Sequence, residues 1–164
     1  MDNISKPLET KLQEQIGHEY HNSRVYRAMS EWAKFNGLNG MAKLLYSYSE
    51  EEVDHAKAFY DYLQDRDVLP ITPPLDKVQI EFKDMEEIIP LIYKTEITTS
   101  AQIDLIYEMA VKDSDHATAE FAFEFVKEQV SEEAKALYWV DRLKAYKQTN
   151  SPLILLDKEM KHKA

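Results

Sequence analysis

The sequence predicts an all-α fold in which four long helices form a bundle and a short fifth helix follows. Only three of the 164 residues are glycine and six are proline, so the chain has few of the turn residues that an all-β fold requires. Apolar residues recur at steps of three and four over four long segments, which is the spacing of helices with one buried face. At this length one domain is expected, so residues 1–164 are assigned to a single domain with the bundle over about 7–147.

The first predicted helix covers about 7–35, with Ser5 as its N-terminal cap. Two of the three glycines lie in residues 36–40, which predicts a turn before a second helix over about 41–66. Three prolines exclude a helix just afterwards, and the stretch over about 67–83 is long for a connection. A bundle needs such a long crossover when its second and third helices run parallel.

The third helix is expected over about 84–111, where Pro90 either kinks the helix or marks a later start. A turn with capping residues then precedes a fourth helix over about 116–147. The fifth helix is expected over about 151–161, with Ser151 as its cap. Its beginning is continuously apolar, and a monomer would leave much of it exposed, which predicts association with other chains.

Composition excludes several classes of function. The net charge of -10 makes nucleic acid a poor partner, because phosphate binding requires a basic face. Cysteine is absent, which removes disulfides, thiolate metal sites and cysteine nucleophiles. The sequence contains no stretch of eighteen apolar residues, so no membrane span is predicted. Residues 1–6 lack the features of a secretory signal. A cytoplasmic protein is therefore expected.

Each of the four apolar stripes carries polar residues near its middle. They are Glu19 in the first helix, Glu52 and His55 in the second, Glu96 in the third, and Gln129 and Glu132 in the fourth. A buried carboxylate without a partner is costly, so burying each of them separately would destabilise the bundle. The middles of antiparallel helices lie at the same height, so we expect these side chains to meet at the centre.

A metal site explains why they would meet. Glu52 and His55 form a Glu-x-x-His pair one helical turn apart, so both side chains can bind one ion. Inward-facing glutamates combined with this pair are typical of di-iron carboxylate bundles. Oxygen ligands with a single histidine suit iron or manganese, whereas a structural zinc site favours cysteine and histidine.

Purely structural interpretations exist for the same residues. Glu52 and His55 could belong to a solvated helix face. Glu19 and Glu96, each taken alone, would be surface glutamates. Gln129 could be a core amide with its hydrogen bonds satisfied.

Two further residues also have both a functional and a structural interpretation. Glu132 lies in a run of charges with Glu128 and Glu133, and such runs are usually solvated. Tyr26, two turns after Glu19, could hydrogen-bond a ligand or lend an electron in oxygen chemistry, or it could simply pack in the core.

Together these features resemble the ferritin family, specifically its non-haem bacterial members. The resemblance runs from about residue 8 to about residue 160. Its most specific segments are residues 19–20 with Tyr26, 51–55, 93–96 and 128–133.

The resemblance implies a role for each candidate ligand. Glu19, Glu52 and His55 would hold a first iron, with Glu52 bridging to a second. Glu96 would hold the second iron with help from Glu132 and Gln129, and Tyr26 would lie beside the centre.

A third iron position in bacterial ferritins corresponds to Glu51, Glu128 and Glu132 in this chain. A further glutamate of that position is replaced by Ser131, which leaves the third site weakened or absent. Bacterioferritins carry a haem-ligating methionine where this chain has Val53, so no haem is expected.

The function implied is an iron-storage ferritin with ferroxidase activity. Such a protein oxidises Fe(II) with dioxygen or hydrogen peroxide and keeps the Fe(III) mineral in a shell of twenty-four identical subunits. The alternatives are a di-iron carboxylate oxidase without mineral storage and a purely structural bundle. The last must explain polar residues on all four core stripes.

Overall fold

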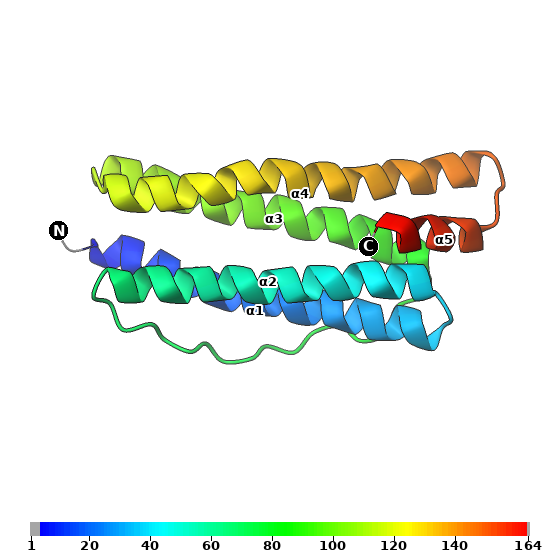
Figure 1. Ribbon diagram of the computed structural model, residues 1–164, viewed down its shortest axis with the longest axis horizontal. Coiled ribbons are helices and arrows are strands. Elements are labelled where there is room, and N and C mark those ends of the chain that lie inside the picture. The colour runs from blue at the N-terminus through cyan, green and yellow to red at the C-terminus, as the bar shows by residue number, and fades with distance from the viewer. Residues whose placement is uncertain (1–3, 164) are drawn as a thin grey trace.

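The computed structural model describes residues 4–163, which contain five helices and no strand. The helices are α1 (Lys6–Phe35), α2 (Asn39–Asp65), α3 (Met85–Lys112), α4 (His116–Gln148) and α5 (Leu153–Lys163). The first four form a bundle in which α1 packs against α2 and α3 against α4, while α5 lies beside one end of the bundle (Figure 1). This arrangement confirms the predicted all-α architecture. Residues 1–3 and 164 of the predicted domain lie outside the described range.

The crossover between α2 and α3 runs the length of the bundle, so these two helices are parallel as predicted (Figure 1). Gln13 of α1 fixes the beginning of this segment. Its amide nitrogen donates to the Leu69 carbonyl at 3.1 Å, and its amide oxygen accepts from the Ile71 backbone N–H at 2.8 Å. An extended segment without helical hydrogen bonds thereby gains partners from a helix that it follows.

Side chains at the N-termini fix where three of the helices begin. Ser5, Asp84 and Asp115 accept from the backbone N–H groups of Leu8, Glu87 and Thr118 in α1, α3 and α4. These caps satisfy donors that have no partner within the helix.

Pro90 does not delay the start of α3, so the later start that the sequence allowed is wrong. The helix begins at Met85, where the Asp84 cap sets its first turn. Pro90 lies inside the helix on its exposed face. The ring removes one backbone donor, and the carbonyl that loses this partner can bind water on that face.

The apolar core divides into two clusters, one at each half of the bundle. One cluster includes Tyr26, Met41 and Trp139. The other includes Leu12, Phe59 and Ile106. The polar residues of the four stripes lie between these clusters, at the middle of the bundle. No helix among residues 4–163 combines the length and apolarity needed to cross a membrane.

The fifth helix completes the beginning of α2. No side chain at Leu38 caps α2, and the Asp157 carboxylate of α5 instead accepts from the Met41 backbone N–H at 2.8 Å. Leu156 and Met160 are fully buried against the bundle. Two neighbouring apolar side chains of α5, Ile154 and Leu155, remain exposed, as expected for part of the apolar beginning of α5.

Gly40 lies in the first turn of α2 and not in the preceding turn, where the sequence placed it. A Cβ at this position would lie 1.7 Å from the backbone oxygen of Asp157. The glycine is therefore required because α5 passes directly over it.

Replacing Gly40 by alanine is expected to lower the free energy of unfolding by about 1–3 kcal/mol, the usual cost of overpacking. The added methyl group must displace α5 and lengthen the hydrogen bond between Asp157 and Met41. Thermal unfolding measures the change. Gly17→Ala in α1 is the control, because a Cβ there meets Pro73 at an ordinary 3.4 Å. An unchanged unfolding temperature for Gly40→Ala would contradict the close approach.

Candidate metal centre

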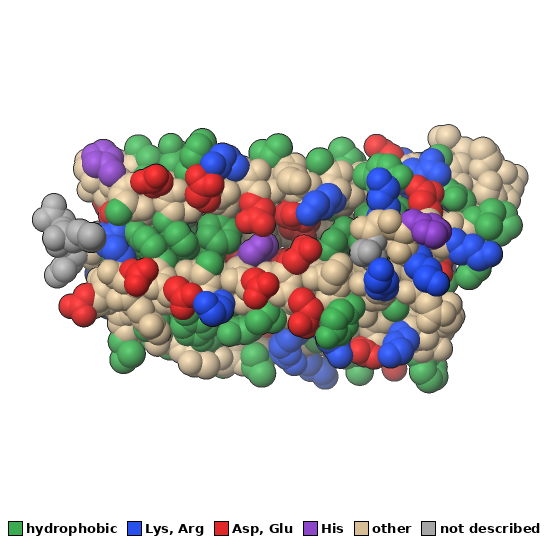
Figure 2. Space-filling view, viewed as in Figure 1, with side chains coloured by type: hydrophobic (Ala, Val, Ile, Leu, Met, Phe, Trp, Pro, Cys, Tyr) green, Lys and Arg blue, Asp and Glu red, His purple; other side chains and the backbone are tan. Residues whose placement is uncertain are grey.

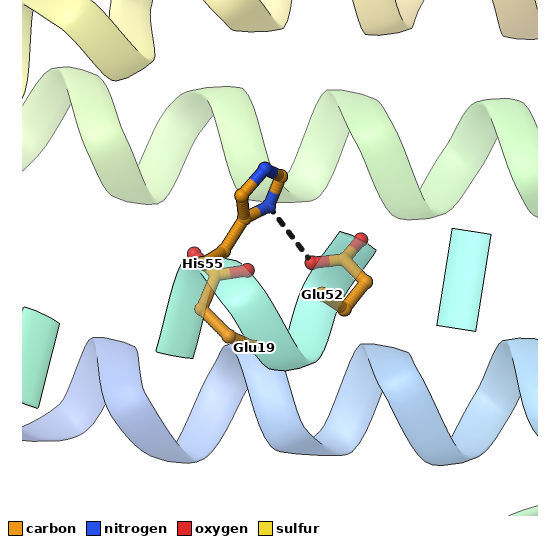
Figure 3. Close-up of side chains that lie close together, drawn as sticks. All are labelled: Glu19, Glu52 and His55. Carbon is orange, nitrogen blue, oxygen red and sulfur yellow. Dashed lines mark ion pairs between the residues drawn. The ribbon is translucent and has the colours of Figure 1, made fainter. Parts of the chain in front are cut away.

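Three of the predicted ligands converge between α1 and α2. Glu19 projects from α1, and Glu52 and His55 project from α2, and the three side chains lie close together (Figure 3). One ligand atom from each of the three lies within 4.8 Å of the other two. His55 Nδ1 lies 3.4 Å from Glu52 Oε2, so the Glu-x-x-His pair faces one point. Oxygen and imidazole ligands at this spacing suit a divalent transition-metal ion.

Two carboxylate oxygens at this point are buried without hydrogen-bond partners. The Glu19 side chain is only 1% exposed and that of Glu52 only 5% exposed. Gln15 donates to Glu19 Oε1 at 2.8 Å, but Glu19 Oε2 and Glu52 Oε2 accept no hydrogen bond. The His55 contact has the distance of an ion pair without hydrogen-bond geometry. Buried anionic oxygens require compensation, and a bound cation would supply it.

Burial also changes the acidity of these groups. It raises the pKa of Glu19 well above its ordinary value, and the neighbouring Glu52 carboxylate adds to the effect. It raises the pKa of Glu52 to about 8, and the charges of Glu96 and Glu132 add to the effect. A cation bound here would favour the ionised carboxylates and displace their protons.

The α3 and α4 side of the centre is organised around Glu96. This carboxylate accepts a hydrogen bond from the Tyr26 hydroxyl and another from Gln129 Nε2 at 3.3 Å. Burial raises the pKa of Glu96, and these two hydrogen bonds oppose the rise. The Tyr26 ring is fully buried and its hydroxyl contacts a candidate ligand, while its part in oxygen chemistry stays a prediction.

The remaining candidates lie at the edge of the centre, between α2 and α4. Glu128 Oε1 lies 3.3 Å from His55 Nε2, on the other side of the ring from Glu52. Glu132 Oε1 is 2.7 Å from the ammonium of Lys135. Glu51 and Ser131 line a cavity of about 570 Å³ together with Lys135.

The predicted ligands are thus not all in one cluster. Among the described residues, only Glu19, Glu52 and His55 form a group with metal-site spacing, while Glu96 lies with Tyr26 and Gln129. Two contributors were missed by the sequence reasoning. Gln15 is four residues before Glu19, and Lys135 is three residues after Glu132. Both spacings place the partners on one helix face and could have indicated these contacts.

Comparisons with known proteins identify relatives over most of the chain. Residues 9–145 match the ferritin-like domain family. The bacterial non-heme ferritin of Bacteroides fragilis (strain 638R) is 33% identical over 141 residues, which cover 86% of this chain and 89% of that protein. The bacterial non-heme ferritin of Escherichia coli O157:H7 is 29% identical over 150 residues, which cover 92% of this chain and 91% of that protein.

The fold has a similarly extensive counterpart among solved structures. An open-pore ferritin from the archaeon Archaeoglobus fulgidus superposes with a TM-score of 0.92 at 28% identity, covering 98% of both chains. The predicted ferritin-like architecture is therefore confirmed, and the chain belongs to the ferritin family.

Proposed function

We propose that this chain is an iron-storage ferritin that binds two Fe(II) ions per subunit, oxidises them and retains the Fe(III) product in an oligomeric cage. The observation that carries the proposal is the pair of buried carboxylate oxygens, Glu19 Oε2 and Glu52 Oε2, which lack hydrogen-bond partners beside His55. A bundle built only for stability would have apolar residues here.

The two metal positions differ in their ligands. Glu19, Glu52 and His55 hold the first Fe(II). Glu96 holds the second with Glu132 and Gln129, and Glu52 bridges. A bridging role suits Glu52 because its carboxylate has ligand spacing to Glu19 and His55 and also lies in the field of the Glu96 charge. Histidine binds one ion only, so the second ion is held more weakly and its product is released more readily.

The reaction is an oxidation in which iron is the substrate. Each of two Fe(II) ions loses one electron, and one dioxygen molecule takes both electrons with two protons to give hydrogen peroxide. With hydrogen peroxide as oxidant, two electrons and two protons give two water molecules. The carboxylate ligands favour the reaction because hard anions stabilise Fe(III) more than Fe(II).

Storage requires assembly into a shell, which we propose to contain twenty-four subunits. The surface of the described chain carries apolar side chains that a subunit interface would cover. On the crossover they are Leu69, Ile71, Leu75 and Ile80. Ile154 and Leu155 add a second such patch on α5. A cytoplasmic location and the absence of haem stay predictions from the sequence.

Aerobic addition of Fe(II) to metal-free protein tests the proposal. We expect rapid growth of Fe(III) absorbance, followed by co-elution of iron with a large assembly in size-exclusion chromatography. Hydrogen peroxide added under argon distinguishes the second oxidant. Oxidation without retained iron or a closed assembly would favour a di-iron oxidase without storage. Oxidation no faster than in buffer alone would favour a structural bundle.

A further inference from the structure

We propose that Lys135 supplies, as a tethered ammonium group, the positive charge that a third cation would bring to the rim carboxylates, Glu51, Glu128 and Glu132. The chain then binds two metal ions per subunit and not three. This inference rests on the proposed function, because it concerns the edge of the same centre.

The position of Lys135 is the first support. Its Nζ lies 2.7 Å from Glu132 Oε1, one helical turn away on α4. The Glu132 side chain is only 13% exposed and that of Lys135 is 47% exposed, so the ammonium covers the carboxylate from the solvent side. Lys135 and Glu51 line the same cavity between α2 and α4. In Figure 2 a blue side chain lies among the red carboxylates near the central purple histidine.

The charges around Lys135 are the second support. The ammonium group donates a hydrogen bond to Glu132 and lies in the negative field of Glu132, Glu51 and Glu128. Lys135 therefore pairs directly with Glu132 and lines the cavity beside Glu51, where a cation bound at the rim would lie.

The third support is the loss of a ligand at the same place. Ser131 lines the cavity with a neutral hydroxyl group, so the rim has three carboxylates and one ammonium group. A divalent ion about 4 Å from an ammonium group is disfavoured about 30-fold by charge repulsion, even at the dielectric constant of water. The neutral Ser131 and the positively charged Lys135 thus both weaken binding of a third metal ion.

Equilibrium dialysis with Zn(II) tests the proposal without relying on oxidation. Zn(II) has no redox chemistry and accepts carboxylate and histidine ligands. We expect two tightly bound Zn(II) ions per subunit in the unsubstituted protein and three in Lys135→Gln. The third ion should bind about 30-fold more tightly in this variant than in the unsubstituted protein. That difference should shrink as salt is added.

Two variants serve as controls. Lys135→Arg keeps the charge and should bind two ions. Lys127→Gln removes the same charge from the same helix, but Lys127 pairs with the exposed Glu124 at 2.6 Å, so it should also bind two. Glutamine has nearly the helix propensity of lysine, so these exposed positions should tolerate it.

The outcomes separate the two proposals. Two ions in both the unsubstituted protein and Lys135→Gln would overturn the role of Lys135 and leave the di-iron centre intact. Three ions in the unsubstituted protein would overturn it as well. No tightly bound ion in either protein would overturn the proposed metal centre and, with it, the inference about Lys135.

Discussion

Fe(II) oxidation is expected to be at least about 100-fold slower in Glu52→Ala than in the unsubstituted protein. Loss of even an outer hydrogen-bond partner of a metal ligand typically costs 10–100-fold in affinity or activity, so loss of a bridging ligand should cost at least as much. Glu52 is buried, contacts His55 and interacts with both Glu19 and Glu96. Its removal therefore weakens both metal positions together.

Stopped-flow absorbance after mixing metal-free protein with Fe(II) and oxygen measures this effect. Glu50→Ala is the matched control, because Glu50 is also on α2 but is exposed, and it should oxidise Fe(II) at the unsubstituted rate. Circular dichroism would verify that both variants retain their helices. Equal rates in Glu52→Ala and Glu50→Ala would place the oxidation elsewhere in the protein.

The metal-free protein is expected to lose stability as the pH rises from about 4.5 to about 8. The pKa of Glu52 is about 8 in the folded protein, against an ordinary value of 4.5. Between these values the folded chain binds more protons than the unfolded chain. Glu52 therefore contributes fully to the stability of the folded protein below about pH 4.5. This contribution is lost as the pH approaches about 8. The loss is on the order of 1 kcal/mol per pH unit for such a group, and the raised pKa of Glu19 acts in the same direction.

Glu52→Gln isolates this effect because the amide is neutral and nearly the same size. At pH 8 the metal-free variant should unfold at a higher temperature than the metal-free unsubstituted protein, and its stability should depend less on pH. Zn(II) should raise the unfolding temperature of the unsubstituted protein at pH 8 and that of the variant much less. Differential scanning calorimetry over this pH range provides the measurement. A pH-independent unfolding temperature for the unsubstituted metal-free protein would contradict the raised pKa.

Helical periodicity predicted the middle of the bundle well because it is a local property. Glu19, Glu52 and Glu96 are buried, as predicted. They follow the same 3.6-residue spacing as the apolar residues of their stripes, so they face the core with them. Their roles as iron ligands stay a prediction. Helix boundaries lie within two residues of those expected, because prolines, glycines and capping residues act over one turn.

Contacts between distant segments could not be predicted in this way. Gly40 was interpreted as a turn residue because nothing near it in the sequence shows that α5 passes over it. The charged run around Glu132 was open to a solvated interpretation. Its pairing with Lys135 is by contrast local, one helical turn away, and the spacing could have indicated it.

The cap that α5 places on α2 has a consequence for synthesis of the chain on the ribosome. Met41 receives its hydrogen-bond partner from Asp157, 116 residues later, so the first turn of α2 stays incomplete until almost the whole chain has emerged. The α1–α2 hairpin can form early because its contacts are local, whereas this end of it awaits the last helix. We therefore expect the end surface of a nascent subunit to stay unfinished until translation is nearly complete.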